Sequence, residues 1–313
     1  MSQYSETTVK AFDDAPIWYR SLGSPKDPVL VLCDGVGCEG YIWKYFLEHF
    51  QQSQRILHWN YRGHGKTPAP GNPDTLTVEQ FAEDLKVVLD DAGVERPAVI
   101  LGHSMGVQVI FEFYHRYPER VTALIPVTGS YGKALDHVHD TGLMKQLFPY
   151  VKSLFQRYTP LAEKFWERAA DSEFAILYSL FFEVNPRLVN REDFAPYFDH
   201  LKRMDPLLFM RCLEAATLHT AESYLPEVSV PVLIVASERD RFTPFWISRR
   251  MRALIPHSEF LTLPTGTHVG PIELPELVNL RIEKFLANLE PAAPAKAARG
   301  ASAIRKKKRP AVL

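Results

Sequence analysis

The stretch Ala98-Val-Ile-Leu-Gly-His-Ser-Met-Gly106 joins a short apolar run to a serine flanked by glycines. The run Ala98–Leu101 predicts a buried strand, and the residues from Met105 onward predict a helix that ends before Pro118. A serine between a strand and a helix, with a glycine two residues away on either side, is typical of a sharp turn that exposes the hydroxyl at the sheet edge. The stretch therefore predicts an α/β fold with Ser104 as a candidate nucleophile.

Strand and helix patterns alternate on both sides of this turn. Apolar or alternating runs predict strands at residues 15–22, Pro28–Cys33, Arg55–Asn60, Val121–Val127, Val230–Val235 and Ser258–Leu263. Helices are predicted over Thr77–Gly93, where Thr77 can serve as the N-cap, and over Glu273–Leu289. Such alternation implies right-handed crossovers and a mostly parallel sheet.

The pattern changes between about Gly132 and Leu225, where no strong strand pattern occurs and helical segments follow one another. We interpret this block as an inserted lid or cap. It is rich in aromatic residues: Phe148, Tyr150, Phe155, Tyr158, Phe165, Trp166, Phe174, Tyr178, Phe181, Phe182, Phe194, Tyr197, Phe198 and Phe209. These side chains indicate either an apolar substrate group in the pocket or simply the core of the lid itself.

A serine hydroxyl is a weak nucleophile at neutral pH, so a histidine must lie within hydrogen-bond reach. Of the eleven histidines, His268 follows the last strand candidate, in the loop Thr265–Gly270, where doubly wound sheets place their sites. The side chain of His103 should point away from the serine, and His64 is expected to order its own loop. The histidines of the helical block have no local motif and are predicted to be surface or lid residues: His137, His139, His200 and His219.

The third group must be a carboxylate that orients the imidazole. Asp240 lies just beyond the strand Val230–Val235, and Glu238 is a rival two residues earlier. The alternative place for the acid, after the preceding strand, reads Thr128-Gly-Ser130 and holds no carboxylate. Asp240 is therefore preferred, and the chain order is serine, aspartate, histidine.

An oxyanion requires two preorganised donors. The backbone N–H of Met105, directly after the serine, is one candidate. The backbone N–H of Val36, in the loop Asp34-Gly-Val-Gly37, is the other, since its glycines let the backbone turn inward.

Taken together, these motifs resemble the α/β-hydrolase-fold serine hydrolases of the esterase and lipase type that carry a helical cap. The resemblance spans roughly residues 8 to 290 and rests on four motifs in order: Gly102–Gly106, Tyr61–Thr67, Glu238–Pro244 and the His268 loop. It implies an eight-stranded, mostly parallel sheet, a lid between strands six and seven, and no cofactor. We expect a hydrolase core over 1–131 and 226–290, a cap over 132–225 and a disordered basic tail over 291–313.

One position departs from this resemblance. The oxyanion loop of such enzymes usually begins His-Gly, whereas this chain has Asp34-Gly35. A carboxylate there could repel an anionic substrate or alter how the loop is held, and we interpret it as a specificity feature. Serine at position 104 excludes the epoxide hydrolases and haloalkane dehalogenases of this fold, which need an aspartate nucleophile.

These residues predict acyl transfer to water from a small-molecule ester or lactone with an apolar group, through an acyl-enzyme on Ser104. A carbon–carbon bond hydrolase, a perhydrolase or an acyltransferase would use the same triad. A non-catalytic binding or receptor protein of this fold is the alternative from a different class, and Asp34 is its only support.

Composition bears on the expected partners, disulfides and cellular location of the protein. The net charge of −1 over 313 residues does not favour a nucleic-acid partner, although Arg305–Arg309 is a basic run. Three cysteines, Cys33, Cys38 and Cys212, are too few for a disulfide framework and are expected to be buried or half-buried free thiols. No signal-like start and no apolar run of roughly 18–20 residues is present, so we expect a cytoplasmic protein without a membrane span.

Overall fold

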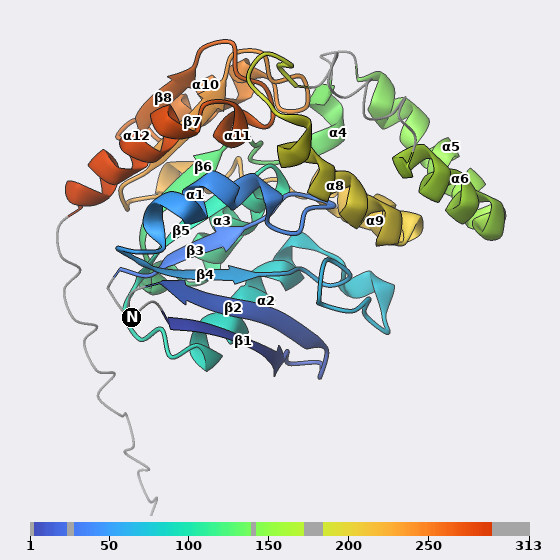
Figure 1. Ribbon diagram of the computed structural model, residues 1–313, viewed down its shortest axis with the longest axis horizontal. Helices are drawn as coiled ribbons and strands as arrows, with labels where there is room; N and C mark the ends of the chain where they lie inside the picture. The colour runs from blue at the N-terminus through green and yellow to red at the C-terminus, as the bar shows by residue number, and fades with distance from the viewer. Residues whose placement is uncertain (1–2, 24–27, 139–141, 172–183, 290–313) are drawn as a thin grey trace, which may run out of the picture.

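The computed structural model describes residues 3–23, 28–138, 142–171 and 184–289, and it is built around one eight-stranded sheet (Figure 1). The strands are β1 (Gln3–Lys10), β2 (Pro16–Gly23), β3 (Leu30–Cys33), β4 (Arg55–Trp59), β5 (Ala98–His103), β6 (Val121–Val127), β7 (Leu233–Ser237) and β8 (Glu259–Leu263). Their order across the sheet is β1-β2-β4-β3-β5-β6-β7-β8. The pairs β1–β2 and β2–β4 are antiparallel and all later pairs are parallel. The predicted fold class is confirmed.

Helices cover both faces of the sheet, which explains why its central strands are continuous apolar runs. One face packs against α2 (Val78–Asp91), α3 (Met105–Arg116) and α10 (Phe245–Leu254). The other packs against α1 (Lys44–Phe50), α11 (Gly270–Glu273) and α12 (Pro275–Ala287). In β3, Val31 and Cys33 face the first layer while Leu30 and Leu32 face the second. The described chain also contains short 3₁₀ turns: η1 (Tyr41–Trp43), η2 (Pro73–Thr75), η3 (Pro118–Arg120) and η5 (Leu225–Glu227).

Between β6 and β7 the chain forms a helical segment, which extends to one side of the sheet in Figure 1. Its described helices are α4 (Ala134–His137), α5 (Leu143–Arg157), α6 (Thr159–Asp171), α8 (Arg191–Arg203) and α9 (Pro206–Leu218). The segment leaves and re-enters the core at one point, where Gly132 and Thr220 form an antiparallel bridge. No part of this segment that the structure describes adds a strand to the sheet.

Proline moves two of the predicted boundaries. The strand predicted from Val230 begins at Leu233, because Pro231 has no N–H to donate to a sheet ladder. The helix predicted over Glu273–Leu289 is α12, which begins at Pro275 in its first position, and the separate short helix α11 precedes it. The helix α1 was not predicted from the sequence.

The remaining sequence expectations concern the cysteines, the membrane and the tail. All three cysteines are free and buried, as expected. Among the residues that the structure describes, no helix has both the length and the apolar character needed to cross a membrane. The basic run Arg305–Arg309 lies outside the described residues.

Candidate active site

Ser104 lies at the junction of β5 and α3 with a left-handed backbone, φ 55° and ψ −117°. This conformation is costly for a residue with a side chain, by about 1–3 kcal/mol, and persists only where the surroundings impose it. Both flanking glycines are required: a Cβ on Gly102 would lie 2.3 Å from the carbonyl oxygen of Gly106, and one on Gly106 would lie 2.4 Å from that of Cys33. The sharp turn predicted from the sequence is therefore present.

The three residues predicted to act together meet at the carboxyl ends of the strands. His268 Nε2 lies 3.0 Å from Ser104 Oγ, and His268 Nδ1 lies 2.9 Å from Asp240 Oδ2. Because an ionised carboxylate can only accept, the Nδ1–H of His268 donates to Asp240. The Nε2 lone pair then faces the serine hydroxyl and can accept its proton. The arrangement can activate a serine for attack on a carbonyl carbon.

Asp240 is held by four donors. Its Oδ1 accepts from the backbone N–H groups of Phe242 at 2.9 Å and Thr243 at 2.8 Å, and its Oδ2 accepts from Thr243 Oγ1 at 2.7 Å as well as from His268. The side chain is buried, whereas Glu238, the rival acid, is exposed. Geometry therefore selects Asp240 of the two carboxylates.

The backbone of His268 is fixed by residues next to the serine. Its carbonyl oxygen accepts hydrogen bonds from His103 Nε2 and Thr128 Oγ1, both at 3.0 Å. His103 lines the cavity beside Ser104, and its Nε2 bonds the backbone of His268 instead of the serine hydroxyl. Burial together with the nearby His268 lowers the pKa of His103 to about 3. His103 is thus a neutral donor. Thr128 directly follows β6, at the alternative position for the catalytic acid, where the sequence has no carboxylate.

The two predicted oxyanion donors belong to different segments, since Met105 begins α3 and Val36 lies in the loop after β3, and both residues line the cavity at Ser104. The N–H of Met105 is the first of α3 and has no acceptor within that helix. The N–H of Val36 has no acceptor among the described residues, whereas its neighbour Gly37 donates to His64 Nε2 at 3.0 Å. His64 Nδ1 in turn bonds the carbonyl oxygen of Arg62 at 3.1 Å, and burial lowers the pKa of His64 to about 4. His64 therefore orders the loop that carries Val36 as well as its own.

The Asp34 carboxylate does not face the site. It is 1% exposed and accepts from Trp43 Nε1 and His58 Nε2, each at 2.8 Å, beneath the loop. It is absent from the described wall of the cavity at Ser104. Asp34 therefore makes no contact with the cavity, and of the two effects expected from its carboxylate, this geometry supports the effect on how the loop is held.

Comparison with known proteins agrees with this geometry. Residues 28–275 match the family described as the alpha/beta hydrolase fold. This chain belongs to that family. Ser104, Asp240 and His268 all lie within the matched region.

Two relatives by sequence and two by structure illustrate the range of the family. The hydrolase is 28% identical over 279 residues to RutD of Shigella flexneri serotype X, a proposed carbamate hydrolase by name, covering 86% of this chain and 96% of that protein. It is 27% identical over 269 residues to RutD of Escherichia coli K12, covering 84% and 92%.

The structural neighbours include an esterase, RhEst1 from Rhodococcus, with a TM-score of 0.75 and 22% identity, covering 91% of this chain and all of that one. They also include an enol-lactonase from Burkholderia xenovorans LB400, with a TM-score of 0.71 and 19% identity, covering 90% and all of that chain. At these identities the structural likeness shows the fold.

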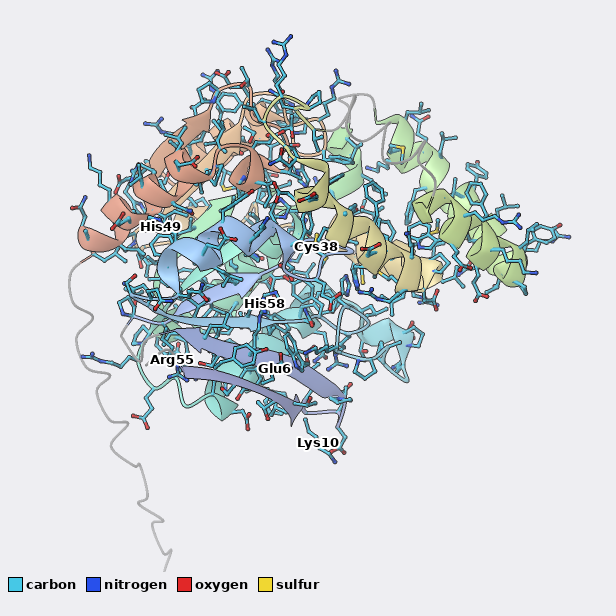
Figure 2. The ribbon with its side chains drawn as sticks, in the orientation of Figure 1. Glu6, Lys10, Cys38, His49, Arg55 and His58 are labelled. Carbon is cyan, nitrogen blue, oxygen red and sulfur yellow. The ribbon has the colours of Figure 1, made fainter. Side chains whose placement is uncertain are left out.

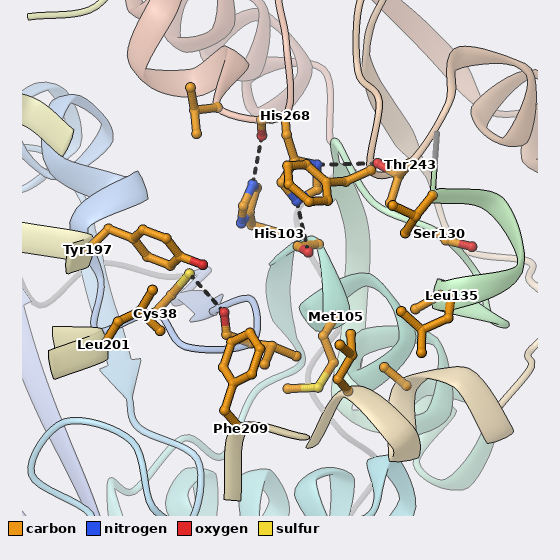
Figure 3. A pocket seen from close by; sticks show the side chains of 18 of the residues that line it. Cys38, His103, Met105, Ser130, Leu135, Tyr197, Leu201, Phe209, Thr243 and His268 are labelled. Carbon is orange, nitrogen blue, oxygen red and sulfur yellow. Dashed lines mark hydrogen bonds between the residues drawn. The ribbon is translucent and has the colours of Figure 1, made fainter. Parts of the chain in front are cut away.

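The hydrolase has a cavity of about 410 Å³ at Ser104, a size typical of small-molecule sites. The helical segment contributes most of its apolar wall: Leu135, Phe194, Phe198, Leu201, Phe209 and Leu213. Figure 3 shows Tyr197 and Leu201 on one side of this space and Leu135 on the other, with His268 and His103 between them. Among the described lining residues there is no lysine, arginine, aspartate or glutamate.

The aromatic residues of the helical segment serve different purposes. Phe194, Phe198 and Phe209 line the cavity, as one reading of the sequence predicted, whereas Tyr150 and Phe165 are exposed. Four others lie outside the described residues: Phe174, Tyr178, Phe181 and Phe182.

Sequence reasoning missed several contributors to the hydrolase site. Cys38 and Val269 line the cavity, and Thr128 holds His268, although none has a local motif. Of the histidines left as surface or lid residues, His200 and His219 are buried, and His139 lies outside the described residues. In the part of the chain that the structure describes, no three histidine, cysteine or acidic side chains gather as a metal site would require.

Proposed function

We propose that this hydrolase cleaves a neutral carboxylic ester or lactone with an apolar group, through an acyl-enzyme on Ser104. The observation that carries the proposal is the chain of hydrogen bonds from Ser104 through His268 to Asp240, in which Ser104 lines an apolar cavity. The named esterase and enol-lactonase among the structural neighbours are consistent with it.

The first half of the reaction forms the acyl-enzyme. Ser104 Oγ attacks the substrate carbonyl carbon as its proton passes to His268 Nε2, 3.0 Å away. Asp240 stabilises the resulting imidazolium, and the carbonyl oxygen becomes an oxyanion bound by the N–H groups of Val36 and Met105. The C–O bond to the alcohol then breaks, and His268 returns the proton to the leaving oxygen.

The second half releases the acid. A water molecule gives a proton to His268 Nε2 and adds to the acyl carbon, which forms a second oxyanion at the same two N–H groups. When this intermediate collapses, the bond to Ser104 Oγ breaks and the serine recovers its proton from His268. A lactone follows the same steps, except that its alcohol stays attached to the acid.

The charge of the cavity argues for a neutral substrate. An anionic group bound in an apolar cavity would lose its hydration, which costs several kcal/mol unless a cation pairs with it. The described wall offers no lysine or arginine for such a pair. Neutral esters with apolar groups avoid this cost and gain roughly 25 cal/mol for each Å² of apolar surface that they bury.

The proposal includes a cap role for the helical segment, with boundaries near residues 132 and 225. Apolar side chains from α8 and α9 cover the serine side of the sheet and form much of the cavity wall. They would therefore set which acyl or alkyl groups fit.

The decisive experiment measures turnover of p-nitrophenyl esters of increasing acyl length, of lactones, and of aryl carbamates by the wild type and by Ser104→Ala. We expect wild-type turnover of esters, preference for medium over acetyl chains, and loss of turnover in the variant. A fluorophosphonate probe should label Ser104 in the wild type. Equal turnover in both proteins would refute the proposal, and absence of turnover and labelling would favour a binding protein.

A matched pair of substitutions on α9 tests the role of the cavity. Leu213 lines the cavity, whereas Leu218, five residues later, is 79% exposed. We expect Leu213→Trp to shift the preferred acyl length to shorter chains and Leu218→Trp to leave it unchanged. The same shift in both variants would contradict the assignment of this cavity to the acyl group.

Faster transfer to an added alcohol or to peroxide than to water would instead identify an acyltransferase or a perhydrolase. Turnover of aryl carbamates above that of every ester would identify the activity named for the sequence relatives. Either result would keep the Ser104 acyl-enzyme and replace only the substrate part of the proposal.

A further inference from the structure

A second aspartate–histidine pair lies beneath the loop that carries Val36. Asp34 Oδ2 and His58 Nε2 are 2.8 Å apart, and Asp34 Oδ1 accepts from Trp43 Nε1 at the same distance. All three side chains are no more than 1% exposed. Figure 2 shows His58 in the body of the molecule along β4, and Cys38 toward the helical segment.

This pair holds the start of the oxyanion loop. A buried carboxylate is tolerated only with good donors, so Asp34 is tied to its two partners. Its carbonyl oxygen also accepts from the Tyr61 hydroxyl at 2.9 Å. Side chain and backbone of Asp34 are both constrained, two residues before the donor N–H of Val36.

The same histidine ring also bounds the end of the loop. Gly40 has a left-handed backbone, φ 85°, and a Cβ there would lie 2.6 Å from His58 Cε1. The ring therefore packs directly against Gly40, at the opposite end from Asp34. One side chain on β4 touches both ends of the segment that contains Val36.

The direction of the hydrogen bond between His58 and Asp34 follows from the chemistry of the carboxylate. The carboxylate of Asp34 accepts, so His58 donates from Nε2, and its buried Nδ1 has no partner among the described residues.

We propose that His58 is a positioning residue for the hydrolase reaction, which acts through Asp34 to hold the Val36 N–H where the oxyanion forms. The proposal rests on the proposed function, since it assigns His58 to the transition state of that same reaction. It accounts for the aspartate in place of the usual histidine of this loop. The carboxylate of Asp34 fixes the loop to the sheet, because His58 on β4 donates a hydrogen bond to it.

The test compares three substitutions of His58. Leucine removes the donor at similar volume, glutamine keeps an N–H near the Nε2 position, and asparagine carries the same amide one methylene shorter. For each folded protein we would measure kcat, KM and the inhibition constant of an apolar boronic acid, whose adduct with Ser104 places an oxygen in the oxyanion site.

Removal of a whole oxyanion donor costs about 100- to 1000-fold in kcat, so a displaced donor should cost less. We expect His58→Leu to lower kcat about 10- to 100-fold, to weaken the boronic acid by a similar factor and to leave KM within about twofold. His58→Gln should recover most of this loss and His58→Asn little of it. If the leucine variant does not fold, the glutamine and asparagine pair decides the question.

A remote hydrogen bond to a buried carboxylate provides the control. Tyr224 donates to Glu112 at 2.7 Å, and neither residue is part of the described cavity wall. Tyr224→Phe should lower stability without changing kcat or boronic acid affinity.

Equal kinetic losses in the Tyr224 and His58 variants, or a folded His58→Leu protein with wild-type kcat and inhibition, would overturn the inference. Absence of ester turnover in the wild type would instead refute the proposed function, so the two failures are distinguishable.

Discussion

Replacement of Asp240 by asparagine tests the relay at the atom that sets the imidazole tautomer. The backbone N–H groups of Phe242 and Thr243 point at Oδ1, so the amide oxygen must stay there. The amide nitrogen then faces His268 Nδ1 at the position of Oδ2, 2.9 Å away. It donates to Nδ1 and moves the imidazole proton to Nε2, which can no longer accept from Ser104.

The size of the effect follows from this reversal. In a serine protease triad the same exchange, with the geometry preserved, lowers kcat by about 10⁴. At 1.36 kcal/mol for each factor of ten, this is about 5.4 kcal/mol of lost transition-state stabilisation. Both backbone donors keep their acceptor, and the hydroxyl of Thr243, which donates to Oδ2, can rotate to accept from the amide nitrogen. We therefore expect only a small change in the free energy of unfolding.

The assay is hydrolysis of a p-nitrophenyl ester of medium chain length, followed at saturating substrate. Glu238→Gln is the matched control, since it makes the same exchange two residues away on an exposed side chain. We expect Asp240→Asn to lose about 10⁴-fold in kcat and the control to keep wild-type turnover. An Asp240→Asn protein within tenfold of wild type, or a larger loss in Glu238→Gln, would refute the reasoning.

Three further predictions concern stability and the nucleophile. Burial lowers the pKa of His64 to about 4, and burial together with the nearby His268 lowers the pKa of His103 to about 3. Below pH 6.5 the unfolded chain therefore binds protons at these two histidines that the folded chain does not bind. The free energy of unfolding should therefore fall as pH decreases from 7 to 5, by up to about 1.4 kcal/mol per pH unit for each histidine; urea titrations that show no such fall would contradict this. Gly35→Ala should lower both kcat and thermal stability, because its Cβ would lie 2.9 Å from Ser104 Cβ and would displace the strained turn that carries the nucleophile; unchanged turnover would argue against it. Arg62→Met should lower the free energy of unfolding by about 3–5 kcal/mol, because it removes the cation that pairs with the buried carboxylate of Asp84. An unchanged urea midpoint would disprove this expectation.

The order of elements and the candidate triad could be predicted from the sequence because their signals are local. A strand, a glycine-flanked serine and a helix lie within one short stretch at Ser104, and Asp240 and His268 each follow a strand candidate. Parallel strands bring their carboxyl ends to one edge of the sheet, so residues in those loops must lie close together. Proline effects at Pro231 and Pro275 shifted boundaries without changing the elements.

Contacts across the sheet could not be predicted in this way. His103 and Thr128 share the carbonyl oxygen of His268, although His103 ends β5, Thr128 follows β6, and no local motif links either to His268. The cavity wall likewise combines side chains from the helical segment and the core, such as Phe209 and Val269. Which side chains converge depends on the packing angle of helices on the sheet, and no local pattern encodes it.

The sequence by itself determined the α/β alternation, the strained turn at Ser104 and the chain order of its partners, because each depends on the chemistry of adjacent residues. Only the tertiary structure decided what Asp34 does. The sequence shows a carboxylate beside the oxyanion loop. The direction in which the Asp34 side chain points depends on its hydrogen bonds to Trp43 and to His58 of the neighbouring strand. Those donors turn it away from the substrate, since a buried carboxylate is stable only where its hydrogen bonds are made.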